Sequence, residues 1–289
     1  MTKVKESISE LRLVQLLILT SLKELARVCH LLKVDYFAIA GTLLGAHRHG
    51  GFIPWDTDAD VGMLRDDYVE FLNKANEVIG TEFIVQSDLN DMDNPNCFAR
   101  IRLKGTRVCE LGNEDRGDFG GFYVDIFPID NIKKLPTGYN IAFQKIVKIM
   151  TRVKAFRAGK KHSSTRLRTL IGYSVNLVFF LVPTSYVRSF LDRYMQRDQS
   201  KKTILVTNYN SKYGIKKQTM PRDVYGIPCE HNFEGFSVST PQLSYKWLEK
   251  IYGDYMKIPA SPSLNLDELL PTYSFDFGPY AYLLELNES

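Results

Sequence analysis

The sequence predicts an α+β protein in which helices flank a mixed β-sheet. Apolar residues at helical spacing, separated by charged residues, mark two amphipathic helices at 8–33 and 66–80. Between and after them lie short runs of apolar or alternating residues, typical of buried strands. These strands are expected at 34–40, 82–86, 98–103 and 121–128. The interleaving of the two patterns gives the fold class.

After Pro136 the strand patterns give way to helical ones, which predicts a mainly helical C-terminal portion. Residues 139–161 are basic and amphipathic, 166–182 are more apolar, and 187–202 form a third helical segment. Basic helices of this kind either pack on a core with solvated charged faces or offer an interfacial surface to acidic lipids. The sequence leaves both alternatives open.

The composition excludes several classes of protein. A chain of 289 residues can bury a full core, and its net charge of +4 is too small to argue for nucleic-acid binding. The four cysteines are widely spaced, with no Cys-x-x-Cys pair, so neither a zinc site nor a disulfide framework is indicated. No secretory signal and no apolar run long enough to span a bilayer is present, and we expect a cytoplasmic protein.

Three aspartates at alternate positions, Asp56, Asp58 and Asp60, are the strongest chemical signal. On an extended segment their side chains fall on one side and repel one another unless a cation neutralises them. Oxygen ligands suit a hard divalent ion, so Mg²⁺ or Mn²⁺ is expected. A calcium-binding EF-hand loop is excluded, because Val61 stands where that loop needs glycine and Asp67 where it needs glutamate.

Candidate phosphate-binding residues surround this acidic segment. Gly41 and Thr42 follow the strand at 34–40, where backbone N–H groups at a helix start can hold phosphate oxygens. Arg48 follows them, and its guanidinium is either a phosphate ligand or a solvated loop cation. Arg100 and Arg102 share one face of the strand at 98–103, where they line a polyanion pocket or form ion pairs with the aspartates.

Asp125 stands alone in an aromatic and β-branched run that otherwise reads as a buried strand. Burying one carboxylate without a partner is costly, so Asp125 is expected to meet a cation, and the candidate is the metal held by Asp58 and Asp60. Asp130, two residues beyond Pro128, is expected at a turn or cap after the strand has ended.

Two carboxylates two residues apart, a third on a later strand and an upstream Gly-Thr turn resemble the nucleotidyltransferase superfamily. The segments Gly41-Thr-Leu-Leu-Gly-Ala-His-Arg, Gly51-Phe-Ile-Pro-Trp-Asp-Thr-Asp-Ala-Asp, Arg65-Asp-Asp-Tyr and Val124-Asp-Ile-Phe-Pro narrow the resemblance to the LicD family, which includes fukutin-related proteins. Phe233-Glu-Gly and Tyr252-Gly-Asp-Tyr-Met resemble the C-terminal pattern of that family. The similarity runs in patches from about residue 10 to about residue 260.

The resemblance implies a nucleotidyltransferase-like catalytic core over residues 1–135. Residues 136–289 would complete the fold and form the acceptor side. It further implies metal-dependent transfer of a phospho-alcohol (phosphocholine, phosphoglycerol or phosphoribitol) from a CDP-alcohol donor to a hydroxyl of a glycan or lipid-linked glycan. Such glycans include capsule, lipopolysaccharide and teichoic acid. A peripheral contact with the inner face of the membrane through the basic helices is compatible with such an acceptor, and no nucleic-acid partner is implied.

The resemblance also assigns roles to residues of this chain. Asp58 and Asp60 would ligate the metal, and Asp125 would be the third carboxylate, aiding metal binding or acting as a base toward the acceptor hydroxyl. Asp56 would support the metal site. The donor phosphates would lie against Gly41 and Thr42, and Arg48 and Arg102 would neutralise their charge.

The chain departs from the family pattern at a few positions. Thr57 and Ala59 replace an expected aspartate and isoleucine, and no histidine-containing tail follows Pro259. Two other functions stay open: a general nucleotidyltransferase acting on a small molecule, and a non-catalytic scaffold that binds lipid or a partner through the basic helices. The acidic cluster favours the enzymes over the scaffold, since a scaffold has no need of mutually repelling carboxylates.

Overall fold

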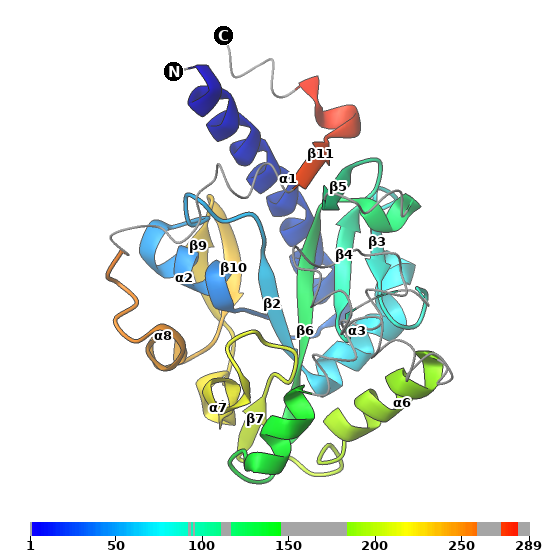
Figure 1. The fold of residues 1–289 in the computed structure, drawn as a ribbon, viewed down its shortest axis with the longest axis vertical. Coiled ribbons are helices and arrows are strands. Elements are labelled where there is room, and N and C mark those ends of the chain that lie inside the picture. Colours follow the sequence, from blue (N-terminus) through cyan, green and yellow to red (C-terminus); the bar gives the residue numbers. More distant parts are fainter. Residues whose placement is uncertain are drawn as a thin grey trace, which may run out of the picture. The chain divides into compact units, whose positions relative to one another are not determined.

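The computed structural model describes residues 2–91, 94, 96–110, 117–145, 184–258 and 273–282. The chain divides into two compact units, each of which is described by itself. Unit 1 comprises Met1–Val85, Arg100–Ile126 and Asp223–Ser289, and unit 2 comprises Gln86–Ala99 and Phe127–Arg222. Figure 1 shows the order of the elements along the chain.

The sheet of unit 1 has the strand order β1-β2-β6-β4-β3, so β2 and β6 are neighbours in its centre. Its strands read as unbroken apolar runs because they are buried, and the core includes Phe37, Val61, Met63, Ile101 and Val124, each no more than 1% exposed. The strands are β1 (Phe37–Ala38), β2 (Asp60–Leu64), β3 (Phe83–Gln86), β4 (Ala99–Leu103) and β6 (Tyr123–Ile132). A separate pair, β5 (Arg107–Glu110) and β11 (Tyr273–Asp276), is antiparallel.

The helices of unit 1 bury their apolar stripes as their sequences predict. In α1 (Thr2–Leu32), Leu22, Leu25 and Val28 are completely buried, and α1 contacts α3 (Arg65–Val78). The short α2 (Ala40–His49) contacts β2 and β9, and it ends at Gly50, whose φ of 68° suits a glycine C-cap. Two further elements are α8 (Ser244–Tyr252), which contacts α2, and the 3₁₀ turn η4 (Gly278–Tyr280).

A tight hairpin joins β9 (Cys229–Phe233) to β10 (Phe236–Thr240). Phe233 pairs with Phe236, so the loop contains only Glu234 and Gly235. Both have positive φ angles, 56° and 70°, which is the backbone of a two-residue type I′ turn. Glycine adopts this conformation freely, but glutamate does so at a cost, which indicates that other contacts hold Glu234 in place.

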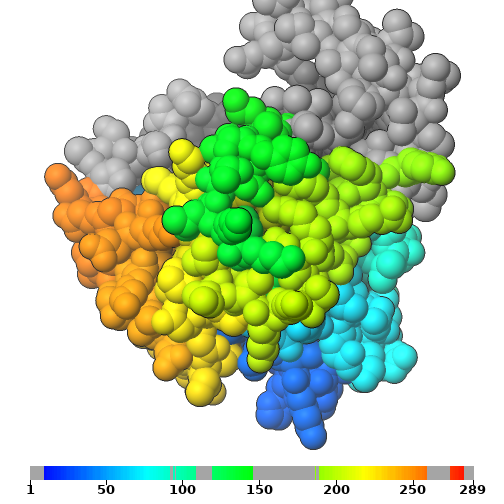
Figure 2. All heavy atoms as spheres, turned by 90° about the horizontal axis from the view of Figure 1, so that it is seen from below, coloured from blue at the N-terminus to red at the C-terminus, as the bar shows by residue number. Residues whose placement is uncertain are grey.

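Unit 2 is built around aromatic and aliphatic side chains from several segments. The last residues of β6 pair antiparallel with β7 (Leu205–Thr207), and β7 pairs with β8 (Met220–Pro221). Figure 2 shows the 127–145 segment in green beside residues 184–222 in yellow-green to yellow. Further elements are α6 (Thr184–Met195), α7 (Ile215–Gln218) and the 3₁₀ turns η1 (Gly117–Gly120) and η2 (Arg222–Val224), of which η1 and part of η2 belong to unit 1. The core residues are Ile132, Phe143, Leu191, Tyr194, Met195, Tyr209 and Ile215.

The prediction that Asp130 follows the end of a strand is wrong. Strand β6 continues to Ile132, and Asp130 is fully buried opposite Thr207 of β7. Pro128 does not end the strand, because its fixed φ is compatible with an extended chain and the pairing of β6 with β7 begins only at Asp130. A proline removes one backbone N–H donor, and that loss alone does not end a strand.

The fold class is confirmed: helices flank a mixed sheet, as an α+β protein requires. The division into a core over 1–135 and a region over 136–289 stays a prediction. The expected helices at 139–161 and 166–182 lie outside the described residues beyond position 145. Within the described part of the chain, no helix combines the length and the apolar character needed to cross a bilayer.

Glu24 ties α1 to the residues that follow α3. Its Oε1 accepts a hydrogen bond of 2.7 Å from the Gly80 N–H, and both its oxygens accept from Arg27, which donates in turn to the Val78 carbonyl. We expect Glu24→Ala to lower the free energy of unfolding by about 1 kcal/mol, since it leaves the partly buried Gly80 N–H without its acceptor. Urea denaturation of the purified protein measures this.

The matched control is Lys74→Ala, which removes an ion pair with Glu70 one turn away on α3, where both side chains are about half exposed. Exposed pairs of this spacing contribute about 0.3–0.5 kcal/mol. Equal losses in the two variants would contradict the role assigned to Glu24.

Candidate functional site

Two segments far apart in sequence bring three acidic residues together in unit 1. Asp58 and Ala59 precede β2, which begins at Asp60, and Asp125 lies in the neighbouring strand β6. The Asp125 N–H donates to the Ala59 carbonyl at 2.9 Å, and the Ile39 N–H donates to the Asp60 carbonyl at 3.0 Å. Asp125 therefore lies beside the residue that separates Asp58 from Asp60. We call these three aspartates the acidic cluster.

The start of α2 fixes the position of Asp60. Thr42 is 3% exposed, and its Oγ1 accepts a hydrogen bond of 2.8 Å from the Asp60 N–H. Gly41 precedes it, and a side chain there would meet the Asp56 carboxylate, so the missing Cβ leaves room for Asp56. Ala40 has a φ of 50°, a strained conformation for a residue other than glycine. Gly41 and Thr42 thus hold Asp56 and Asp60 in this structure, and phosphate contact by either stays a prediction.

Arg100 of β4 forms an ion pair with Asp125. Its Nε lies 2.5 Å from Oδ1 and its Nη2 lies 3.4 Å from Oδ2, with both side chains about 12–13% exposed. Buried Asp125 does meet a cation in this structure, and that cation is Arg100. The metal that the sequence named as its candidate partner stays a prediction. The sequence left open whether the arginines of this strand pair with the aspartates, and Arg100 does so.

Tyr123 joins the two arginines of β4. The guanidinium carbons of Arg100 and Arg102 lie 3.9 Å and 4.7 Å from the centroid of its ring. Arg102 is 4% exposed, and its Nη1 donates to the Gly121 carbonyl at 2.7 Å. Donor binding by Arg102 stays a prediction, and the contacts described here stabilise the start of β6.

The electrostatics of the cluster follow from burial. Burial is the largest cause that raises the pKa of Asp125, and the charge of Asp58 raises it further, against the opposing effect of Arg100. For Tyr123, Arg100 lowers the pKa, but burial and Asp125 outweigh it and raise the pKa to about 12. Tyr123 is therefore a neutral phenol near pH 7. The charge of Asp58 acts on Asp125, so a cation placed between the two carboxylates would be stabilised.

The chemistry of the cluster suits a hard cation, but its geometry is incomplete for one. Carboxylate oxygens are the ligands that Mg²⁺ and Mn²⁺ prefer. Within the described residues, however, no group of three or more His, Cys, Asp or Glu side chains is arranged to hold a metal. The carboxylate oxygens of Asp125 are engaged by Arg100, so a metal that used them would have to compete with this arginine.

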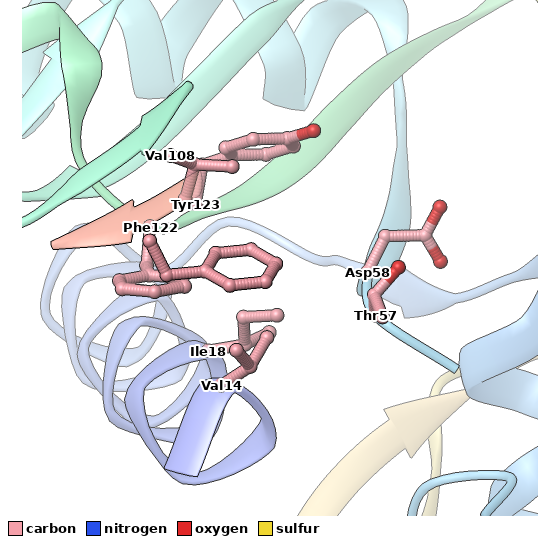
Figure 3. Close-up of a pocket in the computed structure, with 8 residues that line it drawn as sticks. Val14, Ile18, Thr57, Asp58, Val108, Phe122 and Tyr123 are labelled. Atoms are coloured by element: carbon pink, nitrogen blue, oxygen red, sulfur yellow. The ribbon is translucent and has the colours of Figure 1, made fainter. Parts of the chain in front are cut away.

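A pocket of about 90 Å³ opens beside Asp58. Figure 3 shows Thr57 and Asp58 on one side, Phe122 and Tyr123 opposite them, and Val14 and Ile18 of α1 below. The full lining is Val14, Ile18, Thr57, Asp58, Val108, Phe122, Tyr123 and Phe275. Most of the lining side chains are apolar or aromatic, and the Asp58 carboxylate lies at the edge.

Arg48 lies at the end of α2 and reaches the segment after α8. Its Nη1 donates to the carbonyl of Tyr255 at 3.0 Å. This contact joins the end of α2 to the Tyr252-Gly-Asp-Tyr-Met segment. Whether Arg48 also contacts a donor phosphate stays a prediction.

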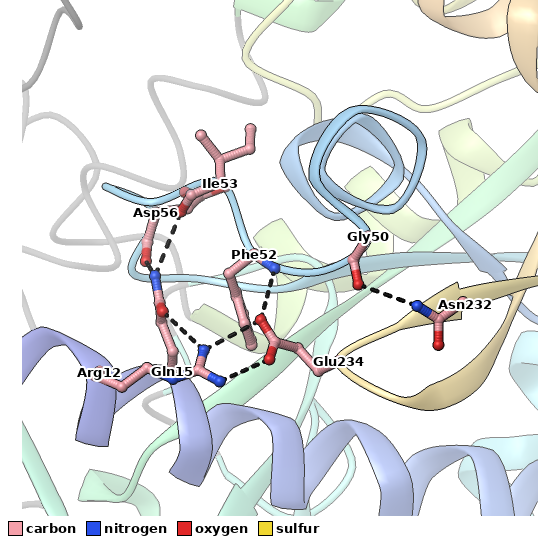
Figure 4. A network of polar contacts seen from close by, with 8 residues as sticks. All are labelled: Arg12, Gln15, Gly50, Phe52, Ile53, Asp56, Asn232 and Glu234. Atoms are coloured by element: carbon pink, nitrogen blue, oxygen red, sulfur yellow. Dashed lines mark hydrogen bonds and ion pairs between the residues drawn. The ribbon is translucent and has the colours of Figure 1, made fainter. Parts of the chain in front are cut away.

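A polar network holds the 50–56 segment, which directly precedes Asp58 and Asp60 of the acidic cluster (Figure 4). Glu234, in the hairpin turn, accepts hydrogen bonds from Arg12 of α1 at 2.6 Å and 3.1 Å and from the Phe52 N–H at 3.1 Å. Its own N–H donates to the Gly50 carbonyl at 2.8 Å. These contacts explain the strained backbone of Glu234: the turn aims one carboxylate at both the helix and the loop.

Gln15, one helical turn after Arg12, continues this network. Its buried Nε2 donates to the carbonyl of Asp56 at 3.0 Å and to that of Ile53 at 3.3 Å. Together with Glu234 it fixes both ends of the 50–56 segment against α1. We call Arg12, Gln15 and Glu234 the loop clamp.

Arg100 was one of two arginines that the sequence offered as pocket lining or as ion-pair partners of the aspartates, whereas Tyr123 and the loop clamp were not predicted. The alternation of Arg100 and Arg102 on one strand was a usable signal for Arg100. No local pattern pairs Arg12 with Glu234, because 222 positions separate them.

Comparisons with known proteins place the residues of this site within a family match. Residues 33–145 match the family model described as the LicD/FKTN/FKRP nucleotidyltransferase domain. The match includes the start of α2, the acidic cluster and Arg100. The resemblance to the LicD family is therefore confirmed.

Named relatives match the chain over different lengths. The chain is 25% identical over 252 residues to a lipopolysaccharide cholinephosphotransferase LicD of Haemophilus influenzae, a match that covers 86% of this chain and 92% of the relative. It is 40% identical over 68 residues to the mouse ribitol 5-phosphate transferase FKRP, covering 22% of this chain and 13% of the relative. An uncharacterised protein of Rickettsia typhi is 46% identical over 39 residues, 14% of this chain and 13% of the relative. Both characterised relatives are named as phosphotransferases.

The loop clamp predicts a pH-dependent stability. The hydrogen bond from Arg12 is the largest cause that lowers the pKa of Glu234 in the folded protein. The ionised carboxylate therefore contributes its full stabilisation at pH values above the pKa of glutamate in the unfolded chain, about 4.3. This stabilisation is lost as the pH falls through the lower folded value. We expect Glu234→Gln to be less stable than the wild type by about 1 kcal/mol at pH 7, with a difference that shrinks below pH ~4.3.

Urea denaturation at a series of pH values tests this. Glu230→Gln, on the same hairpin and hydrogen-bonded to Ser237 in an exposed position, is the control and should change stability by less than about 0.5 kcal/mol. A Glu234→Gln difference that stays constant from pH 7 to pH 3 would show that the charge of Glu234 is unimportant.

Proposed function

We propose that this protein, whose residues 33–145 match the LicD-family model, transfers a phospho-alcohol from a CDP-alcohol to a hydroxyl group of a cell-surface glycan. The relatives support the reaction class, since one is named a cholinephosphotransferase acting on lipopolysaccharide and the other a ribitol 5-phosphate transferase. Phosphocholine, phosphoglycerol and phosphoribitol are the candidate groups. Capsule, lipopolysaccharide and teichoic acid are the candidate acceptors.

The observation that carries the proposal is the pairing of Asp125 with the segment around Ala59. The 2.9 Å backbone hydrogen bond brings a carboxylate of β6 to the two that flank Ala59, beside a pocket with aromatic walls. Mutually repelling carboxylates at the edge of a pocket weaken a fold unless they serve a cation or a reaction.

In the proposed reaction the acceptor oxygen attacks the phosphorus atom that bears the alcohol. A new P–O bond forms to the acceptor, the P–O bond to the bridging oxygen of the diphosphate breaks, and CMP leaves with the electron pair of that bond. The acceptor hydroxyl releases one proton, which goes to a carboxylate or to water. Such transfers are catalysed mainly by positioning and charge neutralisation.

The residues of the chain would divide these tasks. Asp58 and Asp60 are proposed as metal ligands, with Asp125 as the third carboxylate and Asp56 as a supporting residue. Gly41 and Thr42 are proposed to border the donor phosphates, and Arg48 and Arg102 to neutralise their charge. As the third carboxylate, Asp125 is proposed either to aid metal binding or to act as the base toward the acceptor hydroxyl.

A bound Mg²⁺ or Mn²⁺ would supply charge neutralisation at the diphosphate. The residues that would hold it are the acidic cluster, whose oxygen donors fit such an ion. Asp58 lies at the pocket edge, as a residue that meets both metal and donor should.

The acceptor side is proposed to involve residues beyond position 136 and the inner face of the membrane. A lipid-linked glycan would place the hydroxyl acceptor near such a surface, and the basic segment 139–161 has the charge to approach acidic lipids. No nucleic-acid partner is proposed.

The test is a CMP-release assay with a panel of CDP-alcohols, a crude glycan acceptor and Mg²⁺. We expect one donor to release CMP, and Asp58→Asn and Asp60→Asn each to reduce the rate at least about 100-fold, as expected for loss of a group that stabilises transition-state charge. Removal of metal with EDTA should abolish release, and added Mg²⁺ should restore it.

Asp66→Asn is the matched control, because Asp66 belongs to the same sequence block but lies in the first turn of α3. It should retain most of the activity. Release of pyrophosphate from a nucleoside triphosphate, with no CMP from any CDP-alcohol, would instead favour a general nucleotidyltransferase. Equal activity of wild type and Asp58→Asn with every donor would contradict the assigned site.

A further inference from the structure

We infer that Arg100 is a tethered counter-cation: it neutralises Asp125 while the site is empty, and binds the donor diphosphate once a metal takes over the carboxylates. The inference rests on the proposed function and assigns a positioning role to a residue that sequence analysis left without one. Three observations support it, namely the geometry of the ion pair, the stack on Tyr123 and the charges around the guanidinium.

The geometry of the ion pair is that of a guanidinium fork on a two-oxygen anion. Nε and Nη2 of Arg100 approach the two separate oxygens of Asp125, at 2.5 Å and 3.4 Å. The same two-pronged arrangement fits two oxygens of a phosphate. An arginine held in this way needs no new conformation of its fork to accept a phosphate in place of a carboxylate.

Tyr123 restricts where the guanidinium can go. The guanidinium carbon lies 3.9 Å from the ring centroid, so the planar group is stacked on the ring. The attraction between the charge and the ring face favours keeping the guanidinium at this ring when its anionic partner changes. Because Tyr123 also lines the pocket beside Asp58, the ring leads from Asp125 toward the pocket in which the donor is proposed to bind.

The surrounding charges make Arg100 a competitor of a metal. Burial is the largest single influence on the pKa of Arg100 and lowers it, but the negative charges of Asp125 and Asp60 contribute to a larger opposite effect that raises this pKa. A divalent ion at the acidic cluster would be attracted by the same carboxylates and repelled by Arg100. Metal binding and the Arg100–Asp125 pair therefore oppose each other, and a metal that displaces Arg100 frees a positive charge when the anionic donor arrives.

Arg102 offers an internal comparison on the same strand and beside the same ring. Its Nη1 donates to the Gly121 carbonyl, and its guanidinium carbon lies farther from the Tyr123 centroid, at 4.7 Å. Removing Arg102 takes away a similar charge without uncovering the oxygens of Asp125. Comparing variants of Arg100 and Arg102 therefore distinguishes competition for Asp125 from a general loss of positive charge.

The test measures Mn²⁺ affinity by electron paramagnetic resonance, without donor or acceptor. If Arg100 competes with the metal, Arg100→Gln should lower the Mn²⁺ dissociation constant about tenfold. Arg102→Gln should change it less than about threefold. In EDTA, Arg100→Gln should also melt at a lower temperature than the wild type, because Asp125 loses its partner, and Mn²⁺ should restore much of the difference.

A second variant keeps the inference testable if Arg100→Gln folds poorly. Arg100→Lys preserves the charge but replaces the fork with a single ammonium group. It should bind Mn²⁺ about as the wild type does, while the KM for the CDP-alcohol rises about tenfold or more with a smaller change in kcat. A merely structural arginine would leave the KM unchanged.

The outcomes separate this inference from the proposed function. Equal or weaker Mn²⁺ binding by Arg100→Gln than by Arg102→Gln, with wild-type activity present, would overturn only the role of Arg100. Failure of both the wild type and Arg100→Gln to bind Mn²⁺ would overturn the acidic cluster as a metal site, and the inference with it.

Discussion

The backbone hydrogen bond from the Asp125 N–H to the Ala59 carbonyl is the contact on which the candidate site depends. It joins the irregular segment before β2 to the central strand β6, so that carboxylates from two distant parts of the sequence come together. Their mutual repulsion opposes this arrangement. The ion pair between Arg100 and Asp125 offsets that repulsion, and burial makes the pair stronger than it would be in water. Charge compensation within unit 1 thus allows the acidic cluster to exist in the folded chain.

The acidic cluster also depends on residues outside the segment that matches the LicD family. Residues 33–145 contain the carboxylates, but the loop clamp lies in α1 and in the β9–β10 hairpin. Glu234 reaches the Phe52 N–H, and Gln15 reaches the Asp56 carbonyl, so that the loop is held at both ends. A segment with no regular hydrogen-bond ladder of its own needs such partners to hold catalytic side chains in place. This gives a physical reason for the first helix and the Phe233-Glu-Gly turn to accompany the family domain.

Much of the fold was predictable because its signals are local. The period of apolar residues located α1, α3 and the central strands, and the cost of burying Asp125 predicted a cationic partner. The sequence offered Arg100 and Arg102 as partners of the aspartates but did not decide whether either one pairs with Asp125, since strand order is not encoded locally. Asp130 was assigned to a turn because Pro128 was given too much weight. The role of Glu234 was not predictable for a related reason, because its partner Arg12 lies in a helix 222 positions earlier in the chain.

The most direct test of the account is a crystal structure grown with Mn²⁺, in which anomalous scattering locates the ion without reference to activity. The account predicts one strong peak within coordination distance of carboxylate oxygens of Asp58 and Asp60, at about 2.0–2.2 Å as for hard divalent ions with oxygen ligands. It also predicts that the Arg100 guanidinium no longer covers both oxygens of Asp125. A fully occupied Mn²⁺ site elsewhere in the chain, with the acidic cluster empty and Arg100 still on Asp125, would contradict it.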